Sequence, residues 1–409
     1  MTNKIYVVGV TYDDLHELQQ LPVEVINHCA LFISGEKHHH ILKIYQTQIC
    51  PVTPLKETLQ EIESALNRGN VIVLGSGDPL FYGIGSTLLK TFRQENLVFF
   101  PALTSIQRAC SRFKLSWHDA KIISLHGRSH PHLAGLFLSQ AKSLVLTDNK
   151  NTPAKIASDI LEYLKLIDYL EMGEEFQCMV AENLGTDRER IFTGSLKETA
   201  SQESFSPLNV FALVNNKYEA VSRSFGLSEQ EIQHSRGLIT KSEVRAAAIH
   251  QLCLPKKGIL WDIGGGSGSI SIEAARLFPE LVIYCVEQKE EELANIKANI
   301  RKFDCFNVIP VHDNAVNCIT HLPPPDRVFV GGSSGLLAEI INISAEKLPQ
   351  NGRIVVNSVL EKTAREAPKQ MTKHDLQVSS TTISVCRNKG TENELQLNPI
   401  TITTGIKHE

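Results

Sequence analysis

The sequence lacks three features that would each point to a particular class of protein. No apolar stretch among its 409 residues approaches the roughly 18 residues of a membrane span. Its nine cysteines are an odd number and include no Cys-x-x-Cys pair, which argues against a disulfide framework and a zinc ribbon. The 41 Lys and Arg against 45 Asp and Glu give a formal net charge of −4, so no overall basic excess is available for nucleic-acid phosphates. We therefore expect a cytosolic protein without a membrane anchor, a nucleic-acid partner or a bound metal.

Short runs rich in β-branched residues alternate with longer helical segments, a pattern typical of parallel sheets flanked by helices. The runs are residues 5–10, 71–74, 143–147, 259–263, 282–287 and 327–330. The alternation occurs twice, and a polar stretch around residues 215–236 separates the two occurrences. We therefore predict an α/β protein with two domains, residues 1–220 and 221–409. The tail, residues 388–409, is compatible with either a last edge strand or a loose end.

The most specific string in the second half is Ile259-Leu-Trp-Asp262-Ile-Gly264-Gly-Gly266-Ser-Gly268, a strand that runs into a glycine-rich turn and a helix over 270–278. Glycines at such a turn let the backbone approach a ligand at the helix N-terminus. The dinucleotide fingerprint G-x-G-x-x-G needs a glycine where Ser269 stands. The string instead resembles the signature of class I S-adenosylmethionine methyltransferases. This resemblance implies that Asp262, Gly264, Gly266 and Gly268 bind the cofactor, and a tight turn without a ligand is the alternative.

Two acids follow the next two predicted strands. Glu287 ends the strand after the glycine turn, where the same resemblance implies a contact with the ribose hydroxyls of the cofactor. A carboxylate can accept hydrogen bonds from both hydroxyls. Asp313 follows a strand over 307–311, at the place where such domains put a polar residue against the adenine, although an ordinary turn residue is the alternative.

Two cations lie upstream of the glycine turn, in Thr240-Lys241-Ser-Glu243-Val-Arg245. Lys241 and Arg245 are four residues apart, so they share one face of a helix for which Thr240 is a suitable N-cap. Two cations near a methyl donor suit a substrate with several carboxylates. The alternative is a solvated helix with an ion pair to Glu243.

Taken together, three strings of the second half resemble the precorrin-6Y methyltransferases of the cobalamin pathway. The strings are ITKSEVRA, LWDIGGGSGSISIEAAR and PPPDRVFVGG. The resemblance implies methylation of ring carbons 5 and 15 of a tetrapyrrole and decarboxylation of an acetate side chain. One departure concerns the adenine side, because Asp313-Asn-Ala315-Val316 stands where the family usually has Gly-x-Ala-Pro.

The first half resembles a different family, the tetrapyrrole methylases, in the string Ser76-Gly-Asp-Pro-Leu-Phe-Tyr-Gly-Ile-Gly85. Without the resemblance, this string is an ordinary strand-to-helix connection. The family has two α/β lobes with an S-adenosylmethionine site between them. The resemblance implies that the cofactor contacts Gly75, Gly77, Asp78, Thr104 and Ser105. It also makes His126 and Arg128 anchors for substrate carboxylates or proton relays.

The first half departs from that family at its first loop. The strand over 5–10 leads into Thr11-Tyr12-Asp13-Asp14, where relatives have a glycine-rich loop, and only Gly9 remains. A non-catalytic module that holds the macrocycle is therefore an alternative for the first half. Further on, His38, His39 and His40 are open to three interpretations: a metal site, a substrate contact or a solvated loop.

These observations predict a bifunctional enzyme with two S-adenosylmethionine sites that acts on a tetrapyrrole polycarboxylate. Methyl transfer to an electron-rich ring carbon mainly requires that donor and acceptor are held in line, so no catalytic triad is needed. Lys241, Arg245, His126 and Arg128 are then the residues expected to handle the substrate. An RNA or protein methyltransferase is the alternative function, and we expect a homo-oligomer of unspecified size.

Overall fold

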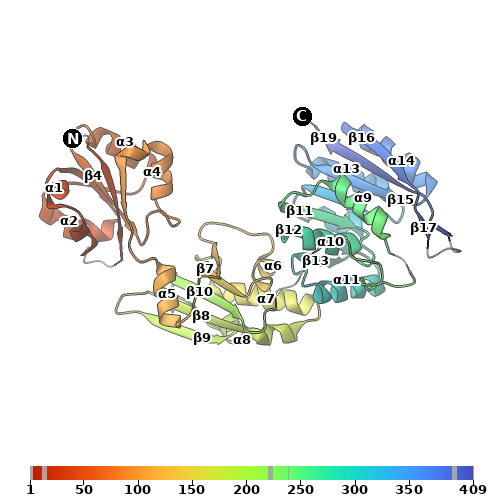
Figure 1. Cartoon of the computed structure of the whole chain (residues 1–409), viewed down its shortest axis with the longest axis horizontal. Helices are drawn as coiled ribbons and strands as arrows, with labels where there is room; N and C mark the ends of the chain where they lie inside the picture. The colour runs from red at the N-terminus through yellow and green to blue at the C-terminus, as the bar shows by residue number, and fades with distance from the viewer. Residues whose placement is uncertain (1–2, 12–15, 220–223, 238, 389–393, 409) are drawn as a thin grey trace.

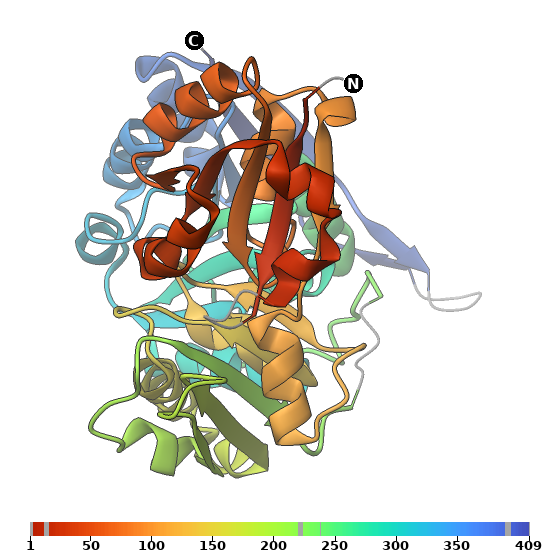
Figure 2. The same ribbon diagram turned by 90° about the vertical axis from the view of Figure 1, so that its left-hand side faces the viewer.

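The computed structural model describes residues 3–11, 16–219, 224–237, 239–388 and 394–408, which form three α/β units (Figure 1). The first half of the chain contains a first lobe (residues 3–104) and a second lobe (residues 105–219), and the second half (residues 224–408) forms the third unit. The first lobe and the second half rise from the same side of the second lobe, which lies between them (Figures 1 and 2).

The first lobe is a parallel sheet in the order β3-β2-β4-β1-β5. Its central strand β4 is buried over residues 71–74, as the β-branched run predicts, because helices or loops cover both faces of the sheet. The elements are β1 (Ile5–Val10), α1 (Val23–Asn27), β2 (Cys29–Ser34), α2 (His39–Leu42), β3 (Gln48–Pro51), α3 (Leu55–Ala65), β4 (Asn70–Ser76), α4 (Gly85–Thr91) and β5 (Leu97–Phe100).

The second lobe corrects the expectation that every sheet is parallel. Its order is β6-β7-β10-β8-β9, and only β6 and β7 are parallel to each other. The seven residues 183–189 that join β8 to β9 are too few for a crossover helix, so these strands must be antiparallel. The elements are α5 (Ser105–Phe113), β6 (Lys121–Ser124), α6 (Leu133–Leu138), β7 (Lys142–Leu146), α7 (Pro153–Leu166), β8 (Phe176–Glu182), β9 (Arg190–Ser195), α8 (Leu196–Ala200) and β10 (Asn209–Asn215).

The second half is a seven-stranded sheet in the order β13-β12-β11-β14-β15-β19-β16. The tail forms β19, which is antiparallel to both β15 and β16 and therefore lies inside the sheet, not at its edge. The strands are β11 (Lys257–Ile263), β12 (Glu280–Glu287), β13 (Val308–His312), β14 (Arg327–Val330), β15 (Arg353–Ser358), β16 (Leu376–Ile383) and β19 (Ile400–Lys407), with a small pair β17 (Cys386–Asn388) and β18 (Glu394–Gln396). The helices are α9 (Ser242–Leu252), α10 (Ser269–Leu277), α11 (Glu290–Lys302), α12 (Ala315–Ile319), α13 (Leu337–Lys347) and α14 (Glu361–Lys373).

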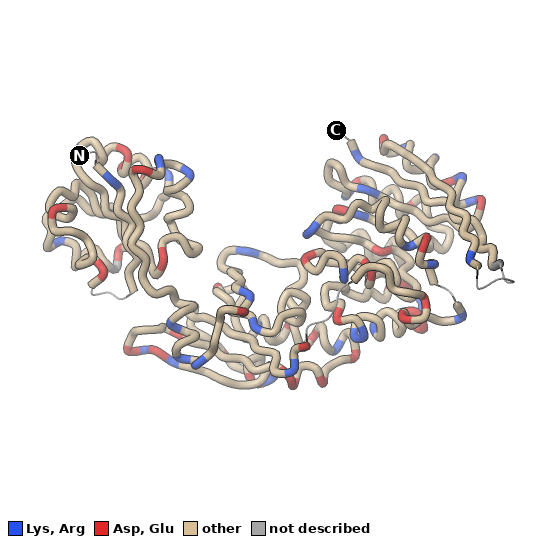
Figure 3. Tube along the Cα trace, viewed as in Figure 1, with Lys and Arg blue, Asp and Glu red and all other residues tan. Residues whose placement is uncertain are grey.

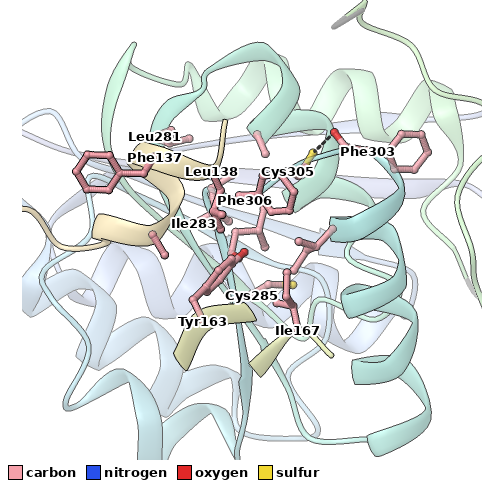
Figure 4. Close-up of a cluster of buried hydrophobic side chains, with 14 of the residues drawn as sticks. Phe137, Leu138, Tyr163, Ile167, Leu281, Ile283, Cys285, Phe303, Cys305 and Phe306 are labelled. Carbon is pink, nitrogen blue, oxygen red and sulfur yellow. Dashed lines mark hydrogen bonds between the residues drawn. The ribbon is translucent and has the colours of Figure 1, made fainter. Parts of the chain in front are cut away.

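The two halves share one hydrophobic core. Figure 4 shows Phe137 and Tyr163 of the second lobe beside Ile283 and Phe306 of the second half, and all four side chains are buried. The contact lies along β13, the edge strand of the seven-stranded sheet. An exposed sheet edge can pair with other chains, so the second lobe also protects this edge.

Two buried hydrogen bonds fix this contact. The Nε2 atom of His132 lies 2.7 Å from the carbonyl oxygen of Phe306, and the hydroxyl of Tyr163 donates to the carbonyl oxygen of Val308 at 2.7 Å. The two rings also touch edge to face, with centroids 4.6 Å apart. Burial lowers the pKa of His132 to about 4, so the ring is neutral at pH 7 and its Nε2–H donates to Phe306.

No helix within the described part of the chain is long and apolar enough to cross a membrane.

Candidate functional site

The glycine turn between β11 and α10 is built by two glycines with different tasks. Gly264 has a φ of +67°, and a Cβ atom there would lie 2.3 Å from the carbonyl oxygen of Gly332, so only glycine fits against the end of β14. Gly266 has a φ of +55°, and a Cβ atom there would meet no described atom within 4 Å. A side chain at position 266 would therefore project into open space, where a ligand can approach the backbone.

That open space divides into two cavities that share Gly264 and Gly266. The first, called the acidic cavity, measures about 210 Å³ and is bordered by the carboxylates of Glu287, Glu292 and Asp313. Glu287 is 7% exposed, and its carboxylate accepts hydrogen bonds from the backbone N–H groups of Gly266, Gln288 and Lys289, each at 2.9 Å. These bonds hold the carboxylate at the cavity wall, with further lone pairs available for hydroxyl donors.

Asp262 and Gly268 lie outside this lining and shape the turn from below. The Asp262 carboxylate is fully buried and accepts hydrogen bonds from the backbone N–H and the hydroxyl of Ser271, at 3.2 and 2.6 Å. Burial raises the pKa of Asp262 to about 6, and the bonds to Ser271 offset part of that rise. Gly268 is the N-cap of α10. Both residues therefore position the turn that borders the cavity.

The position of Asp313 fits both of its expected roles, a polar residue at the cofactor site and an ordinary turn residue. It lines the acidic cavity, and its Oδ1 accepts a hydrogen bond from the backbone N–H of Asn314 at 2.6 Å, as in an ordinary turn. Its neighbours in the lining include residues that no sequence pattern had indicated. They are Gln288, Asn314, Ser333 and Ser334.

The second cavity, called the apolar cavity, measures about 520 Å³ and is lined mainly by hydrophobic side chains such as Phe329, Val359 and Leu397. Lys241 also lines it. Lys241, not Thr240, is the N-cap of α9, so it begins the helix and does not share a face of it with Arg245. The structure therefore separates two residues that were expected to act together.

Arg245 is 1% exposed and lies inside the second half, not at a cavity. Its Nε atom pairs with the Glu273 carboxylate at 3.1 Å, its Nη1 donates to the carbonyl oxygen of Thr240 at 3.1 Å, and its Nη2 donates to that of Leu227. Glu273 in turn accepts from the backbone N–H of Gly226 at 2.7 Å. Arg245 thus joins α9 and α10 to the segment that connects the two halves, a role that was not predicted.

Arg387, a residue that the sequence analysis missed, ties β17 to the start of α9 near the apolar cavity, which Val385 and Lys241 line. Its guanidinium on β17 contacts Glu229 at 2.7 Å and Glu243 at 2.6 Å. Hydrogen bonds from Arg387 lower the pKa of Glu229 to about 2. Arg387 lies 158 positions from Glu229 and 144 positions from Glu243 in the sequence. No local sequence pattern connects the three residues, so only the tertiary structure brings them together.

The first half contains a third cavity of about 1340 Å³, the inter-lobe cavity, which is lined by residues from both lobes. Of the predicted site residues, Ser105, His126 and Arg128 line it. The Nδ1 atom of His126 lies 3.3 Å from the carbonyl oxygen of Thr147, and the guanidinium of Arg128 lies 5.7 Å from the ring centroid of Tyr82. Both side chains therefore face a space of about 1340 Å³, which is large enough for a macrocycle.

The remaining predicted residues of the first half shape the loops behind this cavity. The Oδ1 atom of Asp78 accepts from the backbone N–H of Leu80 at 2.8 Å, and Thr104 is the N-cap of α5 in a capping box with Gln107. Gly77 packs against Thr104, while Gly75 is the second-to-last residue of β4. None of these four residues lines the inter-lobe cavity, and their contact with the cofactor stays a prediction.

The unusual first loop is only partly described. The described residues of that loop include Thr11, which lines the inter-lobe cavity and accepts a hydrogen bond on its carbonyl oxygen from Arg108 at 3.3 Å. Residues 12–15 lie outside the described residues. Arg108, which also lines the cavity, had no signal in the sequence analysis.

The three consecutive histidines are distributed over different environments. His38 is 3% exposed, the Nε2 atom of His39 lies 3.3 Å from the carbonyl oxygen of Ser34, and His40 is exposed. A solvated loop is therefore wrong for His38. Within the described ranges, no group of three or more His, Cys, Asp or Glu side chains is arranged to hold a metal ion.

Comparison with known proteins matches two different families to two stretches of the chain. The tetrapyrrole (corrin/porphyrin) methylases match residues 4–200, and the precorrin methyltransferase domain matches residues 231–402. A precorrin-6Y C(5,15)-methyltransferase (decarboxylating) from Sinorhizobium sp. is 32% identical over 339 residues, which cover 81% of this chain and 75% of the relative. The chain belongs to the precorrin-6Y C(5,15)-methyltransferase family.

Precorrin-6Y C(5,15)-methyltransferases use S-adenosylmethionine, and the open position at Gly266 beside Glu287 fits such a cofactor. Two shorter relatives of this family carry single activities in their names. A probable cobalt-precorrin-6B C(15)-methyltransferase (decarboxylating) from Pyrobaculum calidifontis is 34% identical over 44% of this chain and 94% of its own length. A probable cobalt-precorrin-7 C(5)-methyltransferase from Methanocaldococcus jannaschii is 27% identical over 50% of this chain and 95% of its own length.

Proposed function

We propose that each half of the chain carries one S-adenosylmethionine site and that the two sites methylate different carbons of one precorrin. The first half, residues 1–220, acts on ring carbon 5. The second half, residues 221–409, methylates carbon 15 and removes the carboxyl group of a ring acetate. The shorter relatives support this assignment, because their names separate a C(5) activity from a C(15) and decarboxylating activity.

The observation that carries the proposal is the pair of cavities around Gly264 and Gly266. The acidic cavity presents Glu287 to a ligand that offers hydroxyl groups, as the ribose of S-adenosylmethionine does. The apolar cavity presents hydrophobic walls and Lys241, which suit the rings and carboxylates of a tetrapyrrole. When bound, S-adenosylmethionine supplies an electrophilic methyl group on a sulfonium.

The chain's own residues contribute position and charge in this proposal. Lys241 pairs with a substrate carboxylate at the apolar cavity, while the hydrophobic walls exclude water from the carboxyl group that is lost. In the first half, His126 and Arg128 hold other carboxylates at the inter-lobe cavity. Asp262, Gly268, Asp78 and Thr104 shape the loops that carry these contacts.

The other candidate functions have less support. Figure 3 shows Lys and Arg interspersed with Asp and Glu along the described chain, and the formal net charge of −4 offers no basic excess that would favour an RNA substrate. Thr11 at the inter-lobe cavity is the observation that favours a non-catalytic first half, because its side chain occupies part of that space. The nine free cysteines support a reducing compartment such as the cytosol, and the homo-oligomer stays a prediction.

Two measurements on the full chain test the proposal. Calorimetric titration with S-adenosylmethionine is expected to give two binding sites per chain. Mass spectrometry of the product from precorrin-6Y is expected to find two added methyl groups and the loss of one CO2. A single binding site together with a single added methyl group would leave only one active half, and the assignment of two catalytic sites would then be wrong.

A further inference from the structure

The apolar cavity contains a polar atom that the fold leaves without a partner. The side-chain Oδ1 of Asn357 is buried, and it accepts no hydrogen bond from any residue that the structure describes. Leaving a buried amide oxygen unpaired costs about 1–3 kcal/mol, so an atom of this kind in a native protein calls for a functional explanation. Because Asn357 lines the cavity, a ligand there can supply the missing donor.

The position of Asn357 places this acceptor at the reactive edge of the sheet. Asn357 is the fifth of the six residues of β15, in register with Ile402 of β19. Side chains alternate along a strand, so Asn357 shares a face with Val355, which belongs to the core beneath the cavity. The carboxyl ends of parallel strands are where open α/β sheets bind ligands, and Gly331 at the end of β14 lines the same cavity.

We propose that Asn357 Oδ1 accepts a hydrogen bond from a pyrrole-type ring N–H of the tetrapyrrole substrate. The inference rests on the proposed function, which places the macrocycle in the apolar cavity. An amide oxygen can accept but cannot donate, so it does not pair with the substrate's carboxylates, which are left to Lys241. The ring N–H groups are the donors that the macrocycle offers from within its apolar framework.

This hydrogen bond strengthens as the methyl group is transferred. The electron pair of a ring C=C bond conjugated to the nitrogen forms the new C–C bond, and the S–C bond breaks with its pair on sulfur, which leaves a neutral thioether. The ring nitrogen takes the positive charge and remains an N–H donor until it later releases its proton to water. A charged N–H makes a stronger hydrogen bond than a neutral one, so Asn357 stabilises the transition state more than the bound substrate.

The variant that tests this role is Asn357→Leu in the full chain, because leucine has nearly the same shape and no acceptor. The single-turnover rate of methylation at carbon 15 is expected to fall about 10- to 100-fold, with KM changed less than about threefold. The melting temperature is expected to stay the same or rise, since the substitution removes a buried unpaired atom. Asn357→Asp keeps an acceptor and is expected to recover most of the lost rate.

A matched control is Asn317→Leu, the same exchange at an exposed position of α12. It is expected to leave the rates of methylation at carbon 5 and at carbon 15 unchanged. If Asn357→Leu instead lowers the affinity for S-adenosylmethionine, the acceptor serves the cofactor's ammonium group and the assignment is wrong. A lower melting temperature with an unchanged rate would make Asn357 a structural residue. A wild-type chain that does not methylate carbon 15 overturns the proposed function. If the wild type is active and Asn357→Leu methylates carbon 15 at the same rate, only this inference is overturned.

Discussion

The two halves of this chain build their candidate sites in different ways. In the second half, the two cavities lie at one edge of a single sheet and share the backbone of one glycine turn. In the first half, the inter-lobe cavity lies between two sheets, and its walls come from separate lobes. A site on one sheet depends on local backbone geometry, whereas a site between lobes depends on how the lobes are held.

The two kinds of site should differ in how strongly a substitution affects ligand binding. The backbone at the second-half cavities leaves no room for even one added atom at some positions. A Cβ atom added at Gly264 would lie 2.3 Å from the carbonyl oxygen of Gly332. The inter-lobe cavity of about 1340 Å³ has more room, and Thr11 is one of the residues that line it. The variants below test whether the two halves differ in this way, beginning with the largest expected effect.

The largest effect is expected from Gly266→Val. A Cβ atom at Gly266 points into the space shared by the two cavities, and the φ of +55° further disfavours a branched residue. Calorimetry should find that the affinity of the second half for S-adenosylmethionine falls more than about 100-fold, while the first half still binds S-adenosylmethionine. Gly226→Val, at a φ of +100° and outside both cavities, shows what a strained valine costs elsewhere in the second half, where the Gly226 backbone N–H donates to Glu273. Unchanged binding by both sites would remove the glycine turn from the cofactor site.

Next, single substitutions should separate Arg245 from Lys241. Arg245→Ala leaves the buried Glu273 carboxylate unpaired and is expected to lower the free energy of unfolding by about 3–5 kcal/mol, measured by denaturant titration. Lys241→Ala is expected to leave stability unchanged and to raise KM for precorrin-6Y about tenfold, because one charged contact with a carboxylate is lost. A destabilised Lys241 variant, or a stable Arg245 variant with weaker substrate binding, would reverse the two roles.

A smaller effect is expected in the first half from Asp78→Ala. The Asp78 carboxylate accepts from the backbone N–H of Leu80 and so shapes the loop beside the inter-lobe cavity, without lining the cavity itself. The rate of methylation at carbon 5 should fall about tenfold as that loop loses its hydrogen bond, while decarboxylation continues. In a time-limited reaction, mass spectrometry should find a product that lacks one methyl group. A fully methylated product at the wild-type rate would favour the non-catalytic module.

The smallest effect at neutral pH concerns the contact between the halves. Burial holds the pKa of His132 at about 4, below the 6.5 of a free histidine. Between pH 6.5 and pH 4 the unfolded chain therefore binds a proton that the native chain does not, so this group lowers stability as the pH falls. His132→Gln keeps a donor for Phe306 and does not titrate. Relative to wild type, its unfolding free energy should gain up to about 3 kcal/mol between pH 7 and pH 4. A constant difference across this range would place His132 outside the buried contact.

Local sequence patterns predicted much of the fold because the relevant interactions are short in range. The strand Ile5–Val10 and the strand Arg327–Val330 begin and end as predicted, since buried β-branched runs leave few alternatives. The strand, turn and helix around Gly264 were predicted for the same reason, and their glycines have the backbone conformations that only glycine adopts easily. The antiparallel second lobe was not predicted, because strand direction depends on connections and not on the runs themselves.

Several strands, the glycine turn and the two family resemblances could be recognised from neighbouring residues alone. Only the tertiary structure decided that Arg245 is buried against Glu273, that the tail lies between β15 and β16, and that Arg387 clamps Glu229 and Glu243. It also decided that His132 and Tyr163 join the halves and that Asn357 faces a cavity with an unpaired oxygen. The physical reason is that burial and charge pairing depend on neighbours far away in the chain, whereas backbone conformation and hydrophobic alternation are written in adjacent residues.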